Sequence, residues 1–150
     1  MSTTATSDFA AAGLRHLQDA QLLHAQQRWP NTDHLSGVAA ECGLKAILLD
    51  FLGGQKDKKD RPVHPNMPEK IGYYGHIDSL WGHLAATAHG RSGAQFAALI
   101  AASSPFGDWN VGERYSDGKH ISEQRAAGHL SEAKKILAMH QLARSNGVLP

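Results

Sequence analysis

A run of apolar residues at helical spacing between residues 28 and 52 places the strongest constraint on the fold of this chain. These apolar residues are three and four positions apart, as on one face of an α-helix, so the run predicts a helix with one buried stripe. Pro30 predicts the break that precedes the helix, and the Gly53-Gly54 pair predicts its end. The predicted stripe consists of Leu35, Val38, Ala39, Cys42, Ala46 and Leu49.

Three further segments with helical spacing predict an all-α fold. The first spans about residues 8–28 and begins at a Ser7 or Asp8 cap, the third helix begins at His76, and the last helix follows a loop at 105–119. No segment alternates as a sustained strand does, so we expect an all-α helical bundle. The predicted inward residues are Phe9, Leu17, Ala20 and Leu23; Ile77, Leu80, Trp81, Leu84 and Ala88; and Ala126, Leu130, Ala133, Leu137 and His140.

Two parts of the chain interrupt this helical pattern. Residues 55–75 contain three prolines and a mixed-charge cluster without helical or strand period, so they predict a long surface loop. The excess of lysine and arginine over aspartate in this loop fits either a solvated surface or an edge that contacts phosphate. In the third helix, Gly90 and Gly93 predict a bend or an interruption, after which the apolar pattern continues through Phe96, Leu99 and Ile100.

Length and composition predict one domain without a membrane segment. The 150 residues suffice for one core, which we place at residues 8–144, between a flexible N-terminus (1–7) and a short tail (145–150). No apolar run approaches the ~20 residues of a transmembrane helix, and the N-terminus lacks the features of a signal peptide. The single cysteine, Cys42, excludes an internal disulfide, and a cytoplasmic location is expected. The net charge of +1 does not indicate nucleic-acid binding over the whole surface.

Glu41 and Lys45 lie four residues apart on the flank of the predicted apolar stripe. A glutamate four residues before a lysine is the favourable order for an ion pair on a helix. An exposed pair of this kind contributes only about 0.3–0.5 kcal/mol to stability. Taken alone, the pair therefore predicts a structural role.

Several separated segments resemble small HEPN-domain proteins, in the order expected for that superfamily. They are HLQDAQLL, RWPNTDHLSG and AAECGLKAIL in the first two predicted helices, and WNVGERY (109–115) before the last helix. The resemblance covers most of residues 10–143. HEPN domains are four-to-five-helix up-and-down bundles found in prokaryotic toxins, phage-defence systems and RNA-cleaving effectors. The resemblance therefore implies this fold and a function of that kind.

The same resemblance implies a catalytic pair at Arg114 and His120. RNA-cleaving members carry an arginine, four to six residues and then a histidine, just before or within the last major helix, and here the spacing is five residues. Histidine titrates near neutrality and can transfer the protons of metal-independent RNA cleavage, while the planar arginine fork suits phosphate oxygens. The Asp117-Gly118 turn lets Arg114 fold back toward His120.

Four further residues are expected to support this pair. Tyr115 can donate a hydrogen bond, and Lys119 can neutralise a phosphate charge. Glu41 and Lys45 are expected to form the rest of the supporting shell. The sequence departs from the commonest form of the motif, because Tyr115 stands where a polar residue such as asparagine usually follows the arginine.

A structural role for the arginine–histidine pair stays open. Arg114 can instead anchor its loop to Glu41 on the second helix, and His120 can simply precede a Ser122 cap of the last helix. In these structural roles, Arg114 and His120 stabilise the fold and take no part in a reaction.

Other spacings in the sequence indicate weaker sites. Arg28 and His34 satisfy the same arginine–histidine spacing across Pro30, but they lie far from the last helix. Histidine–glutamate pairs three residues apart do occur, yet there is no HExxH, no ExxH and no glycine-rich phosphate loop. We therefore expect neither a metal site nor a cofactor.

The leading functional expectation is a metal-independent endoribonuclease of toxin or phage-defence type, with RNA as substrate and a cognate antitoxin as a partner. One histidine cannot easily serve as base and acid at once, so we expect a homodimer whose two protomers build a composite cleft. The alternative is a non-catalytic HEPN binding module that partners a nucleotidyltransferase or another effector. A nucleotide or small-ligand binder is a third interpretation.

Overall fold

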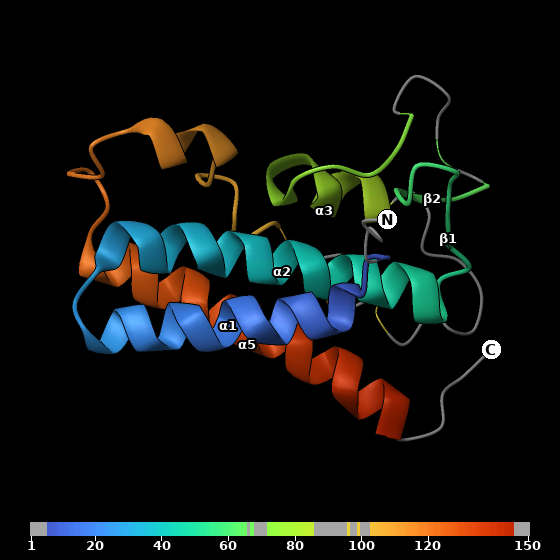
Figure 1. The fold of residues 1–150 in the computed structure, drawn as a ribbon, viewed down its shortest axis with the longest axis horizontal. Coiled ribbons are helices and arrows are strands. Elements are labelled where there is room, and N and C mark those ends of the chain that lie inside the picture. The colour runs from blue at the N-terminus through green and yellow to red at the C-terminus, as the bar shows by residue number, and fades with distance from the viewer. Residues whose placement is uncertain are drawn as a thin grey trace, which may run out of the picture.

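Three long helices form the body of the protein, and two shorter helical segments lie over the middle one (Figure 1). The computed structural model describes residues 6–65, 67, 72–85, 96, 99 and 103–145. In these residues the architecture is all-α apart from one very small sheet. The elements are α1 (Phe9–Ala25), α2 (Trp29–Phe51), β1 (Gln55–Lys56), β2 (Pro62–Val63), α3 (Ile77–Ala85), the 3₁₀ helix η2 (Val111–Tyr115) and α5 (Glu123–Ser145).

The first helix begins where the sequence predicts and ends earlier. The Asp8 carboxylate accepts a hydrogen bond from the backbone N–H of Ala11 at 3.0 Å, which caps α1. The helix ends at Ala25 rather than near residue 28, because Gln27 turns the chain with a positive φ of 60°. The turn to α2 is therefore short.

The prediction that Pro30 breaks the chain before the second helix is wrong. Helix α2 begins at Trp29, and Pro30 lies within its first turn. Backbone N–H groups in a first turn have no intrahelical acceptor, so proline costs nothing there. The other end agrees with the prediction: Gly53 has a φ of 79°, and the Gly54 N–H donates to the Leu48 carbonyl at 2.9 Å.

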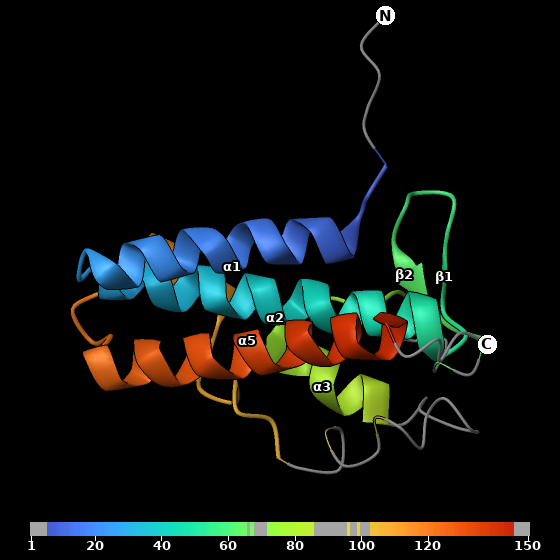
Figure 2. The same cartoon turned by 90° about the horizontal axis from the view of Figure 1, so that it is seen from below.

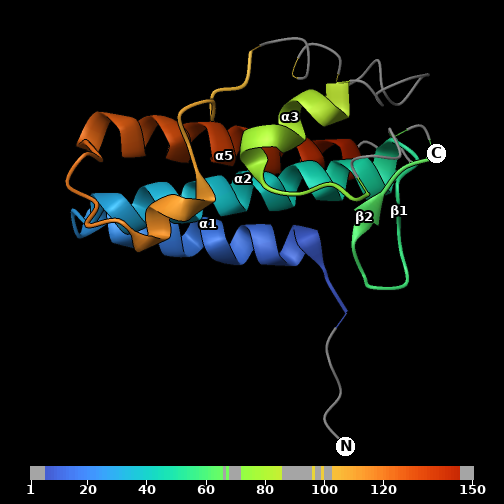
Figure 3. The same cartoon turned by 90° about the horizontal axis from the view of Figure 1, so that it is seen from above.

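Helix α2 is the central element of the fold, with α1 and α5 beside it and α3 and η2 above it (Figure 2 and Figure 3). Because neighbours surround it, it buries more than the one stripe that the spacing predicts. Leu35, Val38 and Leu49 of the predicted stripe are only partly buried. The fully buried side chains of α2 include Ala39, Ala40, Leu44, Ile47, Leu48 and Phe51.

Residues 55–75 are not an unstructured loop throughout, because β1 and β2 pair as a two-residue antiparallel hairpin. Gln55 faces Val63, and Lys56 faces Pro62. The turn of the hairpin is held by the Asp57 carboxylate, which accepts hydrogen bonds from the backbone N–H of Arg61 at 2.9 Å and from its Nε at 2.8 Å. Local turn chemistry, rather than any strand period, produces this hairpin.

The predicted inward face of the third helix is confirmed over the described residues. Helix α3 buries Ile77, Leu80, Trp81 and Leu84. Phe96 is helical and buried, and Leu99 is helical and partly buried. The expectations for Ala88, for Ile100 and for a bend at Gly90 and Gly93 lie outside the described residues.

Helix α5 buries the face that its spacing predicts. The side chain of Ser122 caps it by accepting a hydrogen bond from the N–H of Arg125 at 3.1 Å. The buried residues of α5 are Ala126, His129, Ala133, Ile136, Leu137, His140 and Ala143, while Leu130 is partly buried. In the described part of the chain, no helix has both the length and the apolar character needed to cross a membrane.

Candidate functional site

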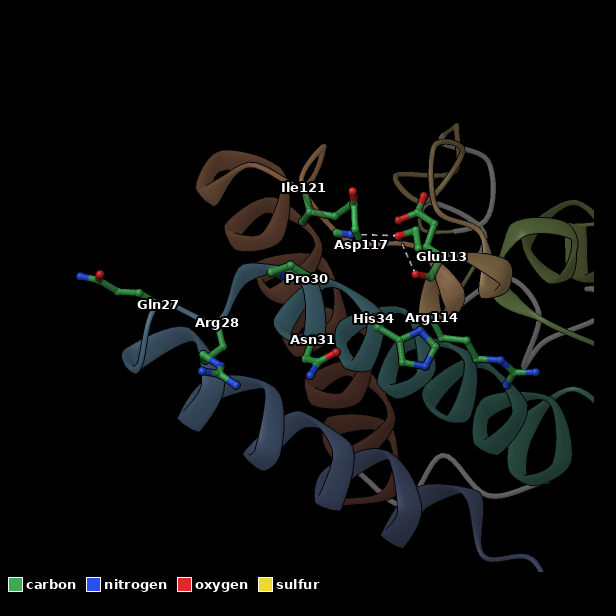
Figure 4. A pocket seen from close by; sticks show the side chains of 11 residues that line it. Gln27, Arg28, Pro30, Asn31, His34, Glu113, Arg114, Asp117 and Ile121 are labelled. Atoms are coloured by element: carbon green, nitrogen blue, oxygen red, sulfur yellow. Dashed lines mark hydrogen bonds between the residues drawn. The ribbon is translucent and has the colours of Figure 1, made fainter.

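A cleft of about 370 Å³ opens between the start of α2 and the segment that joins η2 to α5 (Figure 4). One wall comes from the α1–α2 turn and the first turns of α2, and the other comes from residues 113–121. The lining residues are Gln27, Arg28, Pro30, Asn31, His34, Glu113, Arg114, Ser116, Asp117, Gly118 and Ile121.

The η2 segment is fixed on α2 by Trp109. Its indole Nε1 donates to the backbone carbonyl of Asp33 at 3.1 Å, and its ring lies against Gly37. A Cβ at position 37 would lie only 2.1 Å from the indole, so a glycine is required for this close approach. Trp109 is therefore a core anchor, and it determines where the following residues lie.

A buried ionic network ties the same segment to α2 and α5. The His129 ring lies between two carboxylates, with Nδ1 2.5 Å from Asp33 Oδ1 and Nε2 2.9 Å from Asp108 Oδ1. Arg125 also belongs to this network. Its Nε lies 3.6 Å from Asp33 Oδ2, and one of its terminal nitrogens lies 2.7 Å from Glu113 Oε1. Burial by itself lowers the pKa of His129, but the hydrogen bonds and negative charges of its two aspartates outweigh burial and raise it.

Arg114, the predicted phosphate-stabilising residue, is exposed at the mouth of the cleft. Within the described residues it forms no ion pair, and its guanidinium lies 4.9 Å from the ring centre of Tyr115. Tyr115 itself is 80% exposed. The interpretation that Arg114 anchors its loop to Glu41 does not match the contacts, because Trp109 and Arg125 anchor that segment instead.

His120, the predicted proton-transfer residue, lies beside the cleft and contacts one of its lining residues. Its Nε2 is 3.5 Å from Glu113 Oε2, an ion pair when the ring is protonated. The chain reverses between the two through Gly118, which has a φ of 76° and packs against Pro30 so closely that a Cβ would lie 2.6 Å from the proline ring. Lys119 is exposed, and its backbone N–H donates to the Asp117 carboxylate.

His34 is a lining residue that the resemblance does not indicate. Its ring stacks on Trp109, with ring centres 5.7 Å apart and planes inclined by 14°. Burial, followed by the nearby positive charge of Arg114, lowers the pKa of His34. The one sequence signal for His34 is its arginine–histidine spacing from Arg28, which lines the same cleft.

The structure does not bring Glu41 and Lys45 into contact with the predicted pair. Lys45 Nζ lies 2.9 Å from Glu41 Oε2, and His76 Nδ1 lies 3.1 Å from Glu41 Oε1. The expectation of an exposed ion pair is wrong, because the two side chains are only about a tenth exposed. His76, which directly precedes α3, contacts Glu41, and the Lys45 ammonium lies 5.5 Å from the ring centre of Phe9.

The cleft is therefore lined by two arginines and the histidine His34, with His120 beside it, and these side chains are suited to binding a phosphate ester and to proton transfer. In the described part of the chain, no three histidine, cysteine, aspartate or glutamate side chains are arranged to hold a metal ion. Cys42 lies in the core, where burial raises the pKa of its thiol to about 11. Comparisons with protein-family models, with curated proteins and with solved structures find no match to this chain.

Proposed function

We propose that this protein is a metal-independent endoribonuclease of the HEPN type, acting in a toxin or phage-defence system. The observation that carries the proposal is that Arg114 is exposed and has no ion-pair partner within the described residues. It lines the cleft and lies on a segment that Trp109 and Arg125 anchor. His120 is the proton-transfer residue in this proposal. The family resemblance of the sequence supplies the reaction class.

A comparison of two arginines supports the role of Arg114. Arg125 is engaged with Asp33, Asp108 and Glu113, and these contacts account for its charge. Arg114 has no carboxylate partner among the described residues, although Glu113 is its neighbour in the chain. An arginine left unpaired on a fixed segment can offer its planar fork to the oxygens of a phosphate. It would stabilise the charge that develops on the phosphorane.

Glu113 connects the arginine network to His120. One of its carboxylate oxygens is held by Arg125 at 2.7 Å, and the other lies 3.5 Å from His120 Nε2. A carboxylate that is fixed in this way can orient an imidazole for proton transfer. Tyr115 and Lys119, both exposed nearby, would contact the RNA outside the cleft.

A non-catalytic binding module is the second candidate, and the net charge of +1 favours it. A protein that binds RNA over a broad surface usually carries a larger positive charge. The exposed Tyr115 is equally suited to contact a protein partner. The expected homodimer, antitoxin and nucleotidyltransferase partners belong to these two proposals.

The test is expression of the wild type, His120→Ala and Arg114→Ala in a bacterial host, with growth and total RNA integrity followed together. We expect the wild type to arrest growth with RNA fragmentation, and both variants to be harmless while they stay folded. Arg144→Ala, at an exposed position near the end of α5, is the matched control and should behave as the wild type. Full toxicity of His120→Ala would remove the proposal, and a harmless wild type that forms a stable complex would favour the binding module.

A further inference from the structure

We propose that His34 is a second catalytic residue of the cleft, which accepts the proton of the RNA 2′-hydroxyl while His120 protonates the leaving oxygen. This inference rests on the proposed ribonuclease function. It places both proton-transfer groups in one protomer, so that the chemistry does not require a histidine from a second copy.

His34 lies in the cleft and faces the segment that carries Arg114. It lines the wall of the cleft that α2 provides, while Arg114 and Glu113 belong to the opposite wall (Figure 4). Stacking on Trp109 holds the ring in one orientation, and the same tryptophan anchors the segment that carries Arg114. A single buried side chain therefore positions both the imidazole and the arginine.

Among the residues that the structure describes, His34 is held by its stacking on Trp109 rather than by a hydrogen bond at its shielded ring nitrogen. Within the described residues, His34 Nδ1 is shielded from solvent and has no hydrogen-bond partner. His129 and His140, which are buried residues, instead contact aspartates at 2.5 and 2.6 Å. A buried polar atom without a partner costs about 1–3 kcal/mol, so the Nδ1 atom of His34 lowers stability even though the ring packs on Trp109. A polar residue that lowers stability beside a cleft is typical of a functional site.

Burial and the positive charge of Arg114 both lower the pKa of His34, which favours the neutral imidazole. A neutral imidazole can accept a proton, as a general base must. His120, the proposed acid, lies beside a carboxylate instead, with its Nε2 3.5 Å from Glu113 Oε2.

In the proposed cleavage step, His34 accepts one proton and His120 donates one. The Nε2 lone pair of His34 takes the 2′-hydroxyl proton, and the 2′-oxygen forms a bond to phosphorus. The bond between phosphorus and the 5′-oxygen breaks, and that oxygen takes a proton from His120. The products are a 2′,3′-cyclic phosphate and a 5′-hydroxyl, and the two histidines exchange their protons with solvent. Arg114 would hold the phosphate through the step.

The chain offers a matched control in His24. This histidine also lies against a tryptophan, with ring centres 5.1 Å apart from Trp29, and it also has one buried nitrogen without a partner among the described residues. It faces a different groove, between α1 and α5, which is lined by Gln21 and Lys134 among others. His34→Phe and His24→Phe each keep an aromatic ring beside the tryptophan and remove the nitrogens.

The experiment measures cleavage of a short RNA by the purified wild type, His34→Phe, His24→Phe and His120→Ala, together with thermal unfolding of each. General acid–base groups contribute about 10²–10⁴-fold, so His34→Phe should cleave at least about 100-fold more slowly. Its unfolding temperature should not fall, and its affinity for an uncleavable 2′-O-methyl RNA should stay within about threefold of the wild type. His24→Phe should cleave at the wild-type rate.

A second substrate distinguishes the role of His34 as the base from that of His120 as the acid. In uridine 3′-(4-nitrophenyl phosphate) the leaving group needs no proton, so His120→Ala should recover activity on it while His34→Phe should not. Recovery of His34→Phe would overturn the assignment of His34 as the base. If the wild type cleaves RNA and His34→Phe cleaves within threefold of it, the inference fails and the proposed function stands. If the wild type cleaves neither substrate, both fail.

Discussion

The part of α2 beneath η2 and the middle of α2 beneath the start of α3 both bury charged side chains, but they use them differently. Under η2, Asp33 contacts His129 and Arg125 of α5, which are distant in sequence. Under α3, Glu41 contacts Lys45 on its own helix and His76 above it. The first cluster joins three segments and holds Glu113, which lines the cleft. The second cluster pairs the charge of Glu41 on α2 with Lys45 and His76. Charged residues on one helix thus differ in role according to the segment that covers them.

The largest expected effect comes from removing the centre of the first cluster. His129→Ala leaves Asp33, which is 1% exposed, without its closest partner, and breaking a buried ion pair costs about 3–5 kcal/mol. Urea unfolding monitored by circular dichroism measures this loss. His140→Ala is the control: its partner Asp50 is partly exposed to water, so the loss of the ion pair should cost less. Equal losses of unfolding free energy in the two variants would contradict the expectation that His129 contributes more to stability than His140.

The second cluster should affect stability without affecting the cleft. Lys45→Met removes one of two partners of the Glu41 carboxylate, and an incompletely satisfied buried group costs about 1–3 kcal/mol. RNA cleavage per folded molecule should stay at the wild-type level. Lys135→Met, in an exposed pair with Glu132, should change the free energy of unfolding by less than about 1 kcal/mol. Lost cleavage in folded Lys45→Met would instead support the sequence expectation that Glu41 and Lys45 belong to the site.

The smallest expected effect is a pH dependence with opposite signs at two histidines. The pKa of His129 is raised in the folded protein, so its stabilising contribution is complete below the unfolded value of about 6.5 and is lost as pH rises through the folded value. The pKa of His34 is lowered, so the folded protein loses stability as pH falls from about 6.5 through the folded value.

Unfolding curves of the wild type, His129→Gln and His34→Phe at a series of pH values measure these two contributions. We expect His129→Gln to reduce the loss of stability on the alkaline side of pH 6.5, and His34→Phe to reduce the loss on the acidic side. The same slope in the wild type and both variants would contradict the assigned directions.

Helix ends and inward faces were largely predictable, because they depend on neighbours a few residues away. Asp8 and Ser122 cap their helices, Gly53 ends α2, and the spacing of Ala126 and Ala133 places both in the core. Pro30 was misjudged because a proline in a first turn and a proline before a helix look alike in sequence. The β1–β2 hairpin was missed because two residues are too few to show a strand period.

The candidate site was predictable only in part. The resemblance directs attention to Arg114 and His120, and the structure places both at one cleft or its rim. The resemblance does not indicate His34, since its connection to Arg114 depends on Trp109 packing against Gly37. The surroundings of Glu41 and Lys45 also depend on residues distant in sequence, because His76 contacts Glu41 and the Phe9 ring lies beside Lys45.

The sequence by itself determined the helical class, the caps and most of the buried faces, since these follow from hydrogen bonds and side-chain spacing within about one helical turn. Only the tertiary structure decided which charges that are distant in sequence are paired. Asp33 and His129 are separated by 96 positions, and Trp109 and Asp33 by 76, so no local pattern relates them. Packing of η2 and α5 on α2 leaves Arg125 paired with carboxylates and Arg114 exposed at the cleft. Arg114 has no carboxylate partner among the described residues because the adjacent Glu113 contacts Arg125 and His120 instead. Those contacts exist only in the folded chain.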